Sequence, residues 1–179
     1  MLRIALIYGL VSGAVIIGGM LATIALNGGA PHSNPYLGYL IMLLAMSSVL
    51  VGVKQYRDQA LGGVIRFWPA LGLGLAIAGF AALAYVIIWE VYLAVSGGDF
   101  IQKYADIMLA QKRAEGVTGA AYDKAAADMA AMIKLYANPL FRVPITLLEI
   151  LPVGLLVPVV SAALLRNPRF LPARGAATA

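Results

Sequence analysis

Two glutamates, Glu90 and Glu149, are the residues best placed to do chemistry, because each lies inside a long apolar stretch. A charge within a membrane is costly, so such an acid is normally paired, protonated or turned toward a polar cavity. Counted from the nearer end of its stretch, each carboxylate is expected about 9 Å below the same membrane surface. Two carboxylates at matching depth could share one proton, since both cannot easily ionise at close range.

Arg142 is a third candidate for this region, because it precedes Glu149 by about two helical turns and could lie on the same helix face. The pattern of Glu90, Glu149 and Arg142 is compatible with a proton or cation site. It is also compatible with a hydrogen-bonded pair that joins two helices and has only a structural role.

A second cluster lies in a short polar segment, 54–68, set between two apolar stretches. Lys54 and Asp58 have the i, i+4 spacing that forms an ion pair on a helix. The segment could bind an anionic lipid headgroup or an acidic part of a partner protein. Alternatively, it is a positively charged anchor followed by a turn. The candidate residues are Lys54, Tyr56, Arg57, Asp58, Gly62, Gly63, Arg66 and Trp68.

Residue types that common enzymes and metal sites require are scarce. The sequence has no cysteine and a single histidine, His32, which excludes thiolate and multi-histidine metal sites. The serines in the apolar stretches, Ser12, Ser47 and Ser48, have no histidine to activate them. No hydrolase, metalloprotease or phosphate-binding motif occurs. We therefore expect a protein that is not an enzyme and uses neither a metal nor a cofactor.

Composition indicates what must position these residues. Of 179 residues, 62% are hydrophobic and 12% are charged, and the mean hydropathy is +0.88. A water-soluble domain of this size needs more charge on its surface. Since the apolar residues occur in long blocks, we predict one all-α domain with four transmembrane helices. The predicted spans are 4–26, 37–53, 69–95 and 143–165.

Small residues recur at four-residue spacing within these spans. Gly9 and Gly13 form a GxxxG motif, and the third span holds two similar pairs that begin at Gly72 and Gly74. The spacing favours close helix packing, although glycine is also common in membrane helices generally.

The region 99–137 is the one soluble-looking part, and its pattern predicts a short helical hairpin outside the cytoplasm. The first helix has an apolar face of Phe100, Tyr104, Ile107 and Met108. The second has a stripe of Tyr122, Ala126, Met129, Ile133 and Tyr136 at helical spacing. Such stripes are typical of packing surfaces, so we expect the two helices to pack together and onto the membrane surface.

Charge predicts the orientation. Four spans place both termini and segment 54–68 on one side, which holds seven cations and one acid, whereas the region 99–137 has no net charge. The seven cations are Arg3, Lys54, Arg57, Arg66, Arg166, Arg169 and Arg174. The positive-inside rule then places that side in the cytoplasm. The net charge of +5 reflects this asymmetry, so we do not expect nucleic acid as a partner. The tail, 166–179, is expected to be a loosely ordered cytoplasmic segment.

Three stretches resemble a known family: Lys54–Asp58, Gly62–Phe67 and Tyr85–Glu90. Together they are similar to the domain of unknown function 4199 family. The resemblance implies a bacterial inner-membrane protein of about this length with four spans. It implies no activity, because the family has none established.

Two functions agree with these observations. The first is an accessory or scaffold subunit that contacts lipids, other membrane chains or a second copy of itself. The second is a small transporter or proton-coupled carrier that uses Glu90 and Glu149, and four spans would then require a dimer or larger assembly. The two differ in whether these acids face a cavity or a dry helix contact.

Overall fold

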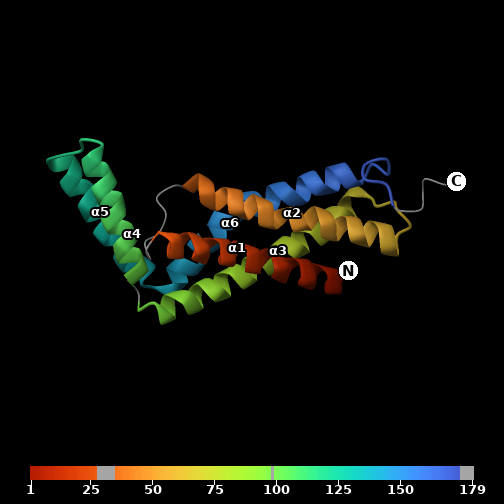
Figure 1. Cartoon of the computed structure of the whole chain (residues 1–179), viewed down its shortest axis with the longest axis horizontal. Coiled ribbons are helices and arrows are strands. Elements are labelled where there is room, and N and C mark those ends of the chain that lie inside the picture. Colours follow the sequence, from red (N-terminus) through yellow and green to blue (C-terminus); the bar gives the residue numbers. More distant parts are fainter. Residues whose placement is uncertain (28–34, 98, 174–179) are drawn as a thin grey trace.

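The computed structural model describes residues 1–27, 35–97 and 99–173, so His32 and Arg174 lie outside the described residues. The described part is entirely helical apart from turns and short connections (Figure 1). The helices are α1 Leu2–Leu26, α2 Pro35–Ala60, α3 Phe67–Val95, α4 Asp99–Ala114, α5 Ala120–Tyr136 and α6 Pro139–Leu165.

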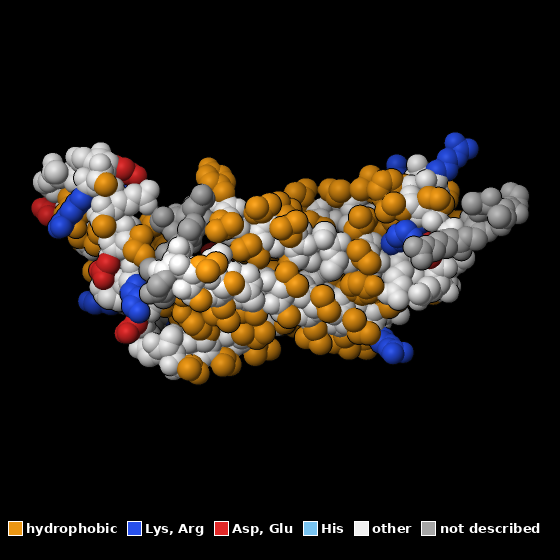
Figure 2. Space-filling view, in the orientation of Figure 1, with side chains coloured by type: hydrophobic (Ala, Val, Ile, Leu, Met, Phe, Trp, Pro, Cys, Tyr) orange, Lys and Arg blue, Asp and Glu red, His pale blue; other side chains and the backbone are white. Residues whose placement is uncertain are grey.

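Four helices, α1, α2, α3 and α6, are long and apolar enough to cross a membrane, with 25 to 29 residues each. A span of this length covers a hydrocarbon core of about 30 Å. The described residues therefore confirm the predicted all-α fold with four membrane-spanning helices. Figure 2 shows hydrophobic side chains along the whole face of this bundle, where lipid chains would contact it.

The bundle is arranged around α2 and α3. Both α1 and α6 pack against this pair, and α2 and α3 also contact each other. The core is made by the faces that these helices share. Its most deeply buried residues include Ile16, Met46, Leu73, Ile77 and Ile150.

The GxxxG motif of α1 is used within this chain, against α3. A side chain at Gly13 would place its Cβ 2.6 Å from the Cβ of Ala84, and one at Gly9 would approach the carbonyl of Ile77 to 2.9 Å. Glycine at both positions lets the two backbones come close. This small-residue face is therefore an internal contact.

The helices α4 and α5 lie side by side at the end of the bundle that is distant from both termini (Figure 1). The predicted apolar residues of both helices are half-buried. Across the contact, the guanidinium of Arg113 lies 4.5 Å from the ring centre of Tyr122. None of the residues of α5 is fully buried, so the pair is packed on one face only.

Two helix boundaries differ from the predicted spans by more than two residues. The polar segment was expected to begin after Val53, but α2 continues to Ala60, so that only 61–66 is non-helical before α3. The fourth helix begins at Pro139, ahead of the predicted residue 143, because the Asn138 side chain accepts a hydrogen bond from the Leu140 amide at 3.0 Å.

The segment that follows α6 also differs from expectation. Residues 166–173 form a folded turn against the bundle, and the Phe170 side chain packs against the core. The polar composition of the tail did not reveal this contact.

Candidate functional site

Glu90 forms an ion pair with Arg142. The Nε of Arg142 donates to one carboxylate oxygen of Glu90 at 2.7 Å, and its Nη2 donates to the other oxygen. The remaining Nη1 donates to the Tyr136 carbonyl at 3.0 Å. Two parallel bonds from one guanidinium to one carboxylate are the strongest form of this contact. The pair joins α3 to the junction between α5 and α6.

Glu149 stands apart from this pair. Among the described residues it has no hydrogen bond or ion pair with Glu90, Arg142 or any other side chain. The structure therefore brings two of the three predicted residues together and leaves the third alone. The matching depth of the two acids does not translate into a contact, because Arg142 occupies both oxygens of Glu90.

Glu149 lines a cavity of about 470 Å³ between the end of the bundle and the α4–α5 pair, hereafter the elbow cavity. All six described helices contribute to its wall, which is mainly aliphatic, aromatic and methionine side chains. Its polar members are few: Thr23, Tyr39, Tyr85, Trp89, Tyr104, Tyr136, Thr146 and Glu149. Glu149 is the one charged residue among the described lining residues.

Aromatic contacts fix the shape of one wall of the elbow cavity. The indole Nε1 of Trp89 donates to the Tyr136 hydroxyl at 2.9 Å, which ties α3 to α5. The ring of Phe100 meets Trp89 edge to face, with 4.8 Å between ring centres, and so ties α3 to α4. Burial raises the pKa of Tyr136, which keeps this phenol uncharged. The Tyr85 hydroxyl donates to the Met20 sulfur at 3.6 Å, which adds α1 to the same wall.

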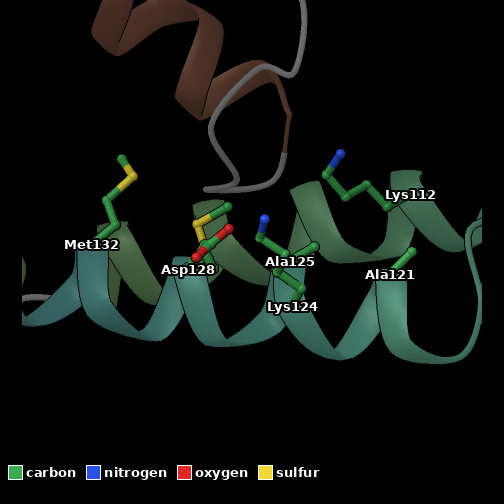
Figure 3. A pocket seen from close by; sticks show the side chains of 7 residues that line it. Lys112, Ala121, Lys124, Ala125, Asp128 and Met132 are labelled. Atoms are coloured by element: carbon green, nitrogen blue, oxygen red, sulfur yellow. The ribbon is translucent and has the colours of Figure 1, made fainter.

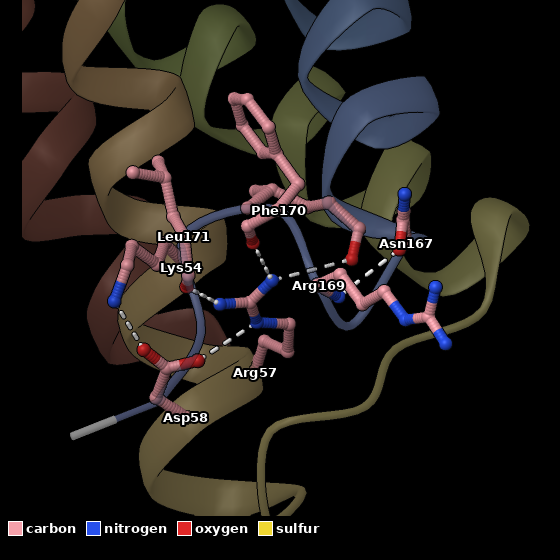
Figure 4. Close-up of polar contacts among 8 residues, drawn as sticks. Lys54, Arg57, Asp58, Asn167, Arg169, Phe170 and Leu171 are labelled. Atoms are coloured by element: carbon pink, nitrogen blue, oxygen red, sulfur yellow. Dashed lines mark hydrogen bonds and ion pairs between the residues drawn. The ribbon is translucent and has the colours of Figure 1, made fainter. Parts of the chain in front are cut away.

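The second predicted cluster lies at the opposite end of the bundle, around the end of α2 (Figure 1), and Figure 4 shows its contacts from close by. Arg57 is fully buried, with 0% exposure. Its Nη1 donates to the Phe170 carbonyl at 2.9 Å, its Nη2 donates to the Leu171 carbonyl, and its Nε donates to Asp58 at 2.7 Å. Lys54 pairs with the other oxygen of Asp58, as the i, i+4 spacing predicted. These contacts hold the turn after α6 against α2.

The glycines of this cluster form the turn out of α2. Gly62 and Gly63 have φ angles of 63° and 93°, and the Gly63 amide donates to the Arg57 carbonyl at 2.9 Å. Arg57 is occupied by the fold, and the exposed members of the predicted headgroup site are Gly62, Arg66 and Trp68, the last 76% exposed. Tyr56 is half-buried against the core.

A shallow depression also lies on the α4–α5 pair (Figure 3). It is lined by Lys112, Lys124, Asp128 and neighbouring alanine and methionine side chains. Its charged side chains are of both signs and all are exposed, so the depression favours neither anionic nor cationic ligands. No group of three metal-ligating side chains occurs among the residues that the structure describes.

The elbow cavity itself was not foreseen from the sequence. Tyr85 and Trp89 belong to a stretch that carried the family resemblance, so the sequence already drew attention to these two lining residues. Met20 and Thr23 had none, because they are ordinary members of an apolar helix. The importance of Arg57 was also missed, since its acceptors are carbonyls more than a hundred positions later in the chain.

Comparison with known proteins identifies the chain at the level of a family. No curated protein and no solved structure matches it. Residues 3–167, nearly the whole chain, match the sequence model of a family described as a protein of unknown function, DUF4199. The chain therefore belongs to the DUF4199 family of proteins of unknown function, and within the described residues it has four helices able to span a membrane.

Proposed function

We propose that this chain is a membrane-embedded binding protein, which takes an organic molecule with an apolar body into the elbow cavity and holds its polar group at Glu149. The observation that carries the proposal is a cavity of about 470 Å³ with mainly apolar walls and one charged group among its described lining residues. Ligand sites of roughly 300–1,000 Å³ have this character, with few polar groups fixing the orientation of the ligand.

The walls support a preformed site. Trp89, Phe100 and Tyr136 are locked to one another across three helices by a hydrogen bond and an edge-to-face contact. A wall that is already ordered loses little side-chain freedom when a ligand enters. The Glu90–Arg142 pair supports the same wall, because Arg142 also holds the Tyr136 carbonyl.

This proposal keeps part of each function expected from the sequence. A carrier would use Glu149 as its acid, with Glu90 in a structural role. An accessory subunit would also need a surface for other chains, and Gly9 and Gly13 of α1 do not supply it because they pack against α3. We therefore place ligand binding first, without an enzymatic step, and assign contacts with lipids or further chains to the exposed apolar faces of the bundle.

We further propose that the chain lies in the bacterial inner membrane with both termini in the cytoplasm, so that the elbow cavity lies toward the outer surface. Six of the seven cations of the predicted inner side are at the end of the bundle that holds segment 54–68, and the seventh is outside the described residues. Gln59 and Thr118 are exposed at opposite ends. Cysteine at Gln59 should react with a membrane-impermeant reagent only from inside, and cysteine at Thr118 only from outside. Labelling of both from one side would contradict this topology.

Ligand binding can be tested with the two tryptophans of the chain. Trp68→Phe removes the exposed indole and leaves Trp89 as a reporter in the wall of the elbow cavity. In lipid nanodiscs, titration with the neutral probe N-phenyl-1-naphthylamine should quench Trp89 fluorescence in a saturable manner. The converse variant, Trp89→Phe, reports the far end of the bundle and should show only a linear, unsaturable response.

A matched pair of glycine variants locates the binding. Gly38 lines the elbow cavity, and Gly79 is exposed on the outer face of α3; a Cβ at either position meets no atom within 4 Å. Gly38→Phe should fill part of the cavity and weaken probe binding, whereas Gly79→Phe should leave it unchanged. Equal binding to both variants, or no saturable binding at all, would contradict the proposed function.

A further inference from the structure

We infer that the ligand of the elbow cavity is a lipophilic organic monocation, with Glu149 as its counter-ion. This inference rests on the proposed function and names the chemical class of its ligand. It follows from three features of the cavity as the described residues form it: an acid with no cation beside it on the wall, aromatic side chains on the same wall, and few oxygen ligands for a metal ion.

The first feature is the unpaired charge of Glu149. No Lys, Arg or His is among the described residues that line the elbow cavity. The basic residue closest along α6, Arg142, directs its Nε and Nη2 to Glu90 and its Nη1 to the Tyr136 carbonyl. The charge of Glu149 is therefore left for something that enters the cavity. Glu149 is exposed on the wall of the cavity, and a carboxylate beside mainly apolar walls attracts a cation more strongly than one surrounded by water.

The second feature is the aromatic wall. Tyr85, Trp89, Tyr104, Tyr136 and Phe100 all line the elbow cavity. Aromatic faces attract organic cations, and they do so more strongly when the site is desolvated. The methionines from four of the helices add polarizable surface that adapts to an irregular apolar body. The combination of one carboxylate and several rings matches alkyl or aryl ammonium and phosphonium ions.

The third feature excludes the competing ligands. Ca²⁺ takes six to eight oxygen ligands and Mg²⁺ keeps several of its waters, whereas the described wall is mainly apolar and offers one carboxylate with a few hydroxyl groups. An anionic ligand such as a fatty acid would place its charge beside Glu149 without a counter-ion. A neutral apolar molecule would fit the walls but would leave the carboxylate unused.

The same arrangement couples binding to a proton. When the cavity is empty, Glu149 can carry a proton. A cation that enters the cavity displaces this proton to water, so that one positive charge replaces another. Among the described lining residues, the other ionisable groups are the phenols of Tyr39, Tyr85, Tyr104 and Tyr136. The nearby Glu90–Arg142 pair is neutral as a unit. Cation binding should thus weaken as the pH falls.

The test uses the Trp68→Phe protein in nanodiscs and calorimetric titration with two ligands of similar shape, tetraphenylphosphonium and neutral triphenylphosphine oxide. Tetraphenylphosphonium should bind at least about tenfold more tightly than triphenylphosphine oxide. A tenfold difference in affinity lies within the range that a desolvated contact between a cation and aromatic rings supplies. Glu149→Gln should abolish that preference and the pH dependence of cation binding. Glu115→Gln, which changes an exposed acid outside the cavity, should preserve both.

The outcomes separate this inference from the proposed function. If N-phenyl-1-naphthylamine binds but the cation has no advantage over triphenylphosphine oxide, the cavity binds ligands and the inference is overturned. If Glu149→Gln weakens the binding of tetraphenylphosphonium and of triphenylphosphine oxide equally, Glu149 only supports the cavity, and the inference also fails. If neither N-phenyl-1-naphthylamine nor tetraphenylphosphonium binds in a saturable manner, the proposed function itself fails.

Discussion

The two ends of the bundle treat their charges differently. At the end near the termini, Lys54, Arg57 and Asp58 are bound to one another, and Arg57 is also bound to the chain after α6. At the other end Glu90 and Arg142 form a similar closed contact, but Glu149 has no partner among the described residues. We infer from this comparison that the paired charges hold the fold, whereas under the proposed function Glu149 is the charge that meets a ligand.

The two arginines also reveal how α6 is held. Arg57 donates to backbone carbonyls just after the C-terminal end of α6. Arg142, in the first turns of α6, ties this helix to α3 and to the end of α5. Glu149 lies between these two fixed points. A helix fixed at both ends presents its middle residues at a constant position, which suits a preformed binding site.

The largest effect is expected from breaking the buried arginine contact. Arg57→Leu removes a guanidinium that is 0% exposed and leaves the Phe170 and Leu171 carbonyls without their donor. Losing one partner of a buried charged contact costs about 3–5 kcal/mol of unfolding free energy. Thermal unfolding of the purified protein in detergent should reveal a large drop in melting temperature.

Two variants sharpen this result. Arg57→Lys keeps the charge but cannot form the same fork of bonds, so it should recover only part of the loss. Arg66→Leu removes an exposed arginine from the same segment and should change the melting temperature little. Similar melting temperatures for Arg57→Leu and Arg66→Leu would mean that the tail is not held by Arg57.

The second effect is expected at the opposite end. Glu90→Leu and Arg142→Leu each leave one charged partner without its counterpart, whereas the double variant leaves neither. The two losses in unfolding free energy should therefore not add, with an interaction of about 1–3 kcal/mol. Melting temperatures of the two single variants and the double variant measure this interaction. Strictly additive losses would show that the pair contributes nothing as a pair.

These contacts show what sequence reasoning could supply. The four helices follow from the apolar blocks, because an uninterrupted apolar block of about 20 residues is long enough to cross the hydrocarbon core as a helix. The Lys54–Asp58 pair follows from i, i+4 spacing, because the helix continues through it. Both inferences are local, and each needs only residues within one element.

The partner of Glu90 could not be chosen in this way. Spacing places Arg142 and Glu149 on similar faces of α6, but which one meets α3 depends on how the two helices cross. The elbow cavity depends in addition on the angle at which α4 and α5 leave the bundle (Figure 1). Such angles arise from packing between elements distant in sequence, so the cavity and the isolation of Glu149 become visible only in the structure.

A smaller effect is expected at the turn that ends α2. Gly63→Ala forces a side chain onto a φ of 93° and brings its Cβ to 3.3 Å from that of Ala173. An L residue in this region costs roughly 1–2 kcal/mol, so the melting temperature should fall by less than for Arg57→Leu. Gly79→Ala, in the middle of α3 with open space around it, is the control and should stabilise the helix slightly. A Gly63→Ala protein as stable as wild type would show that this turn is not held in the conformation described.

The smallest effect on stability is expected at Glu149, and this gives the comparison its sharpest form. Glu149→Gln keeps the size of the side chain, and because no described residue bonds to Glu149, it breaks no contact. The unfolding free energy should change by no more than about 0.5 kcal/mol, as for substitutions away from specific contacts. Glu90→Gln, an identical chemical change, removes the charge that Arg142 requires and should cost clearly more. Both variants can be melted in the same detergent without ligand. If Glu149→Gln lowered the melting temperature as much as Glu90→Gln, Glu149 would have a partner within the fold, and the distinction between a structural and an available charge would be lost.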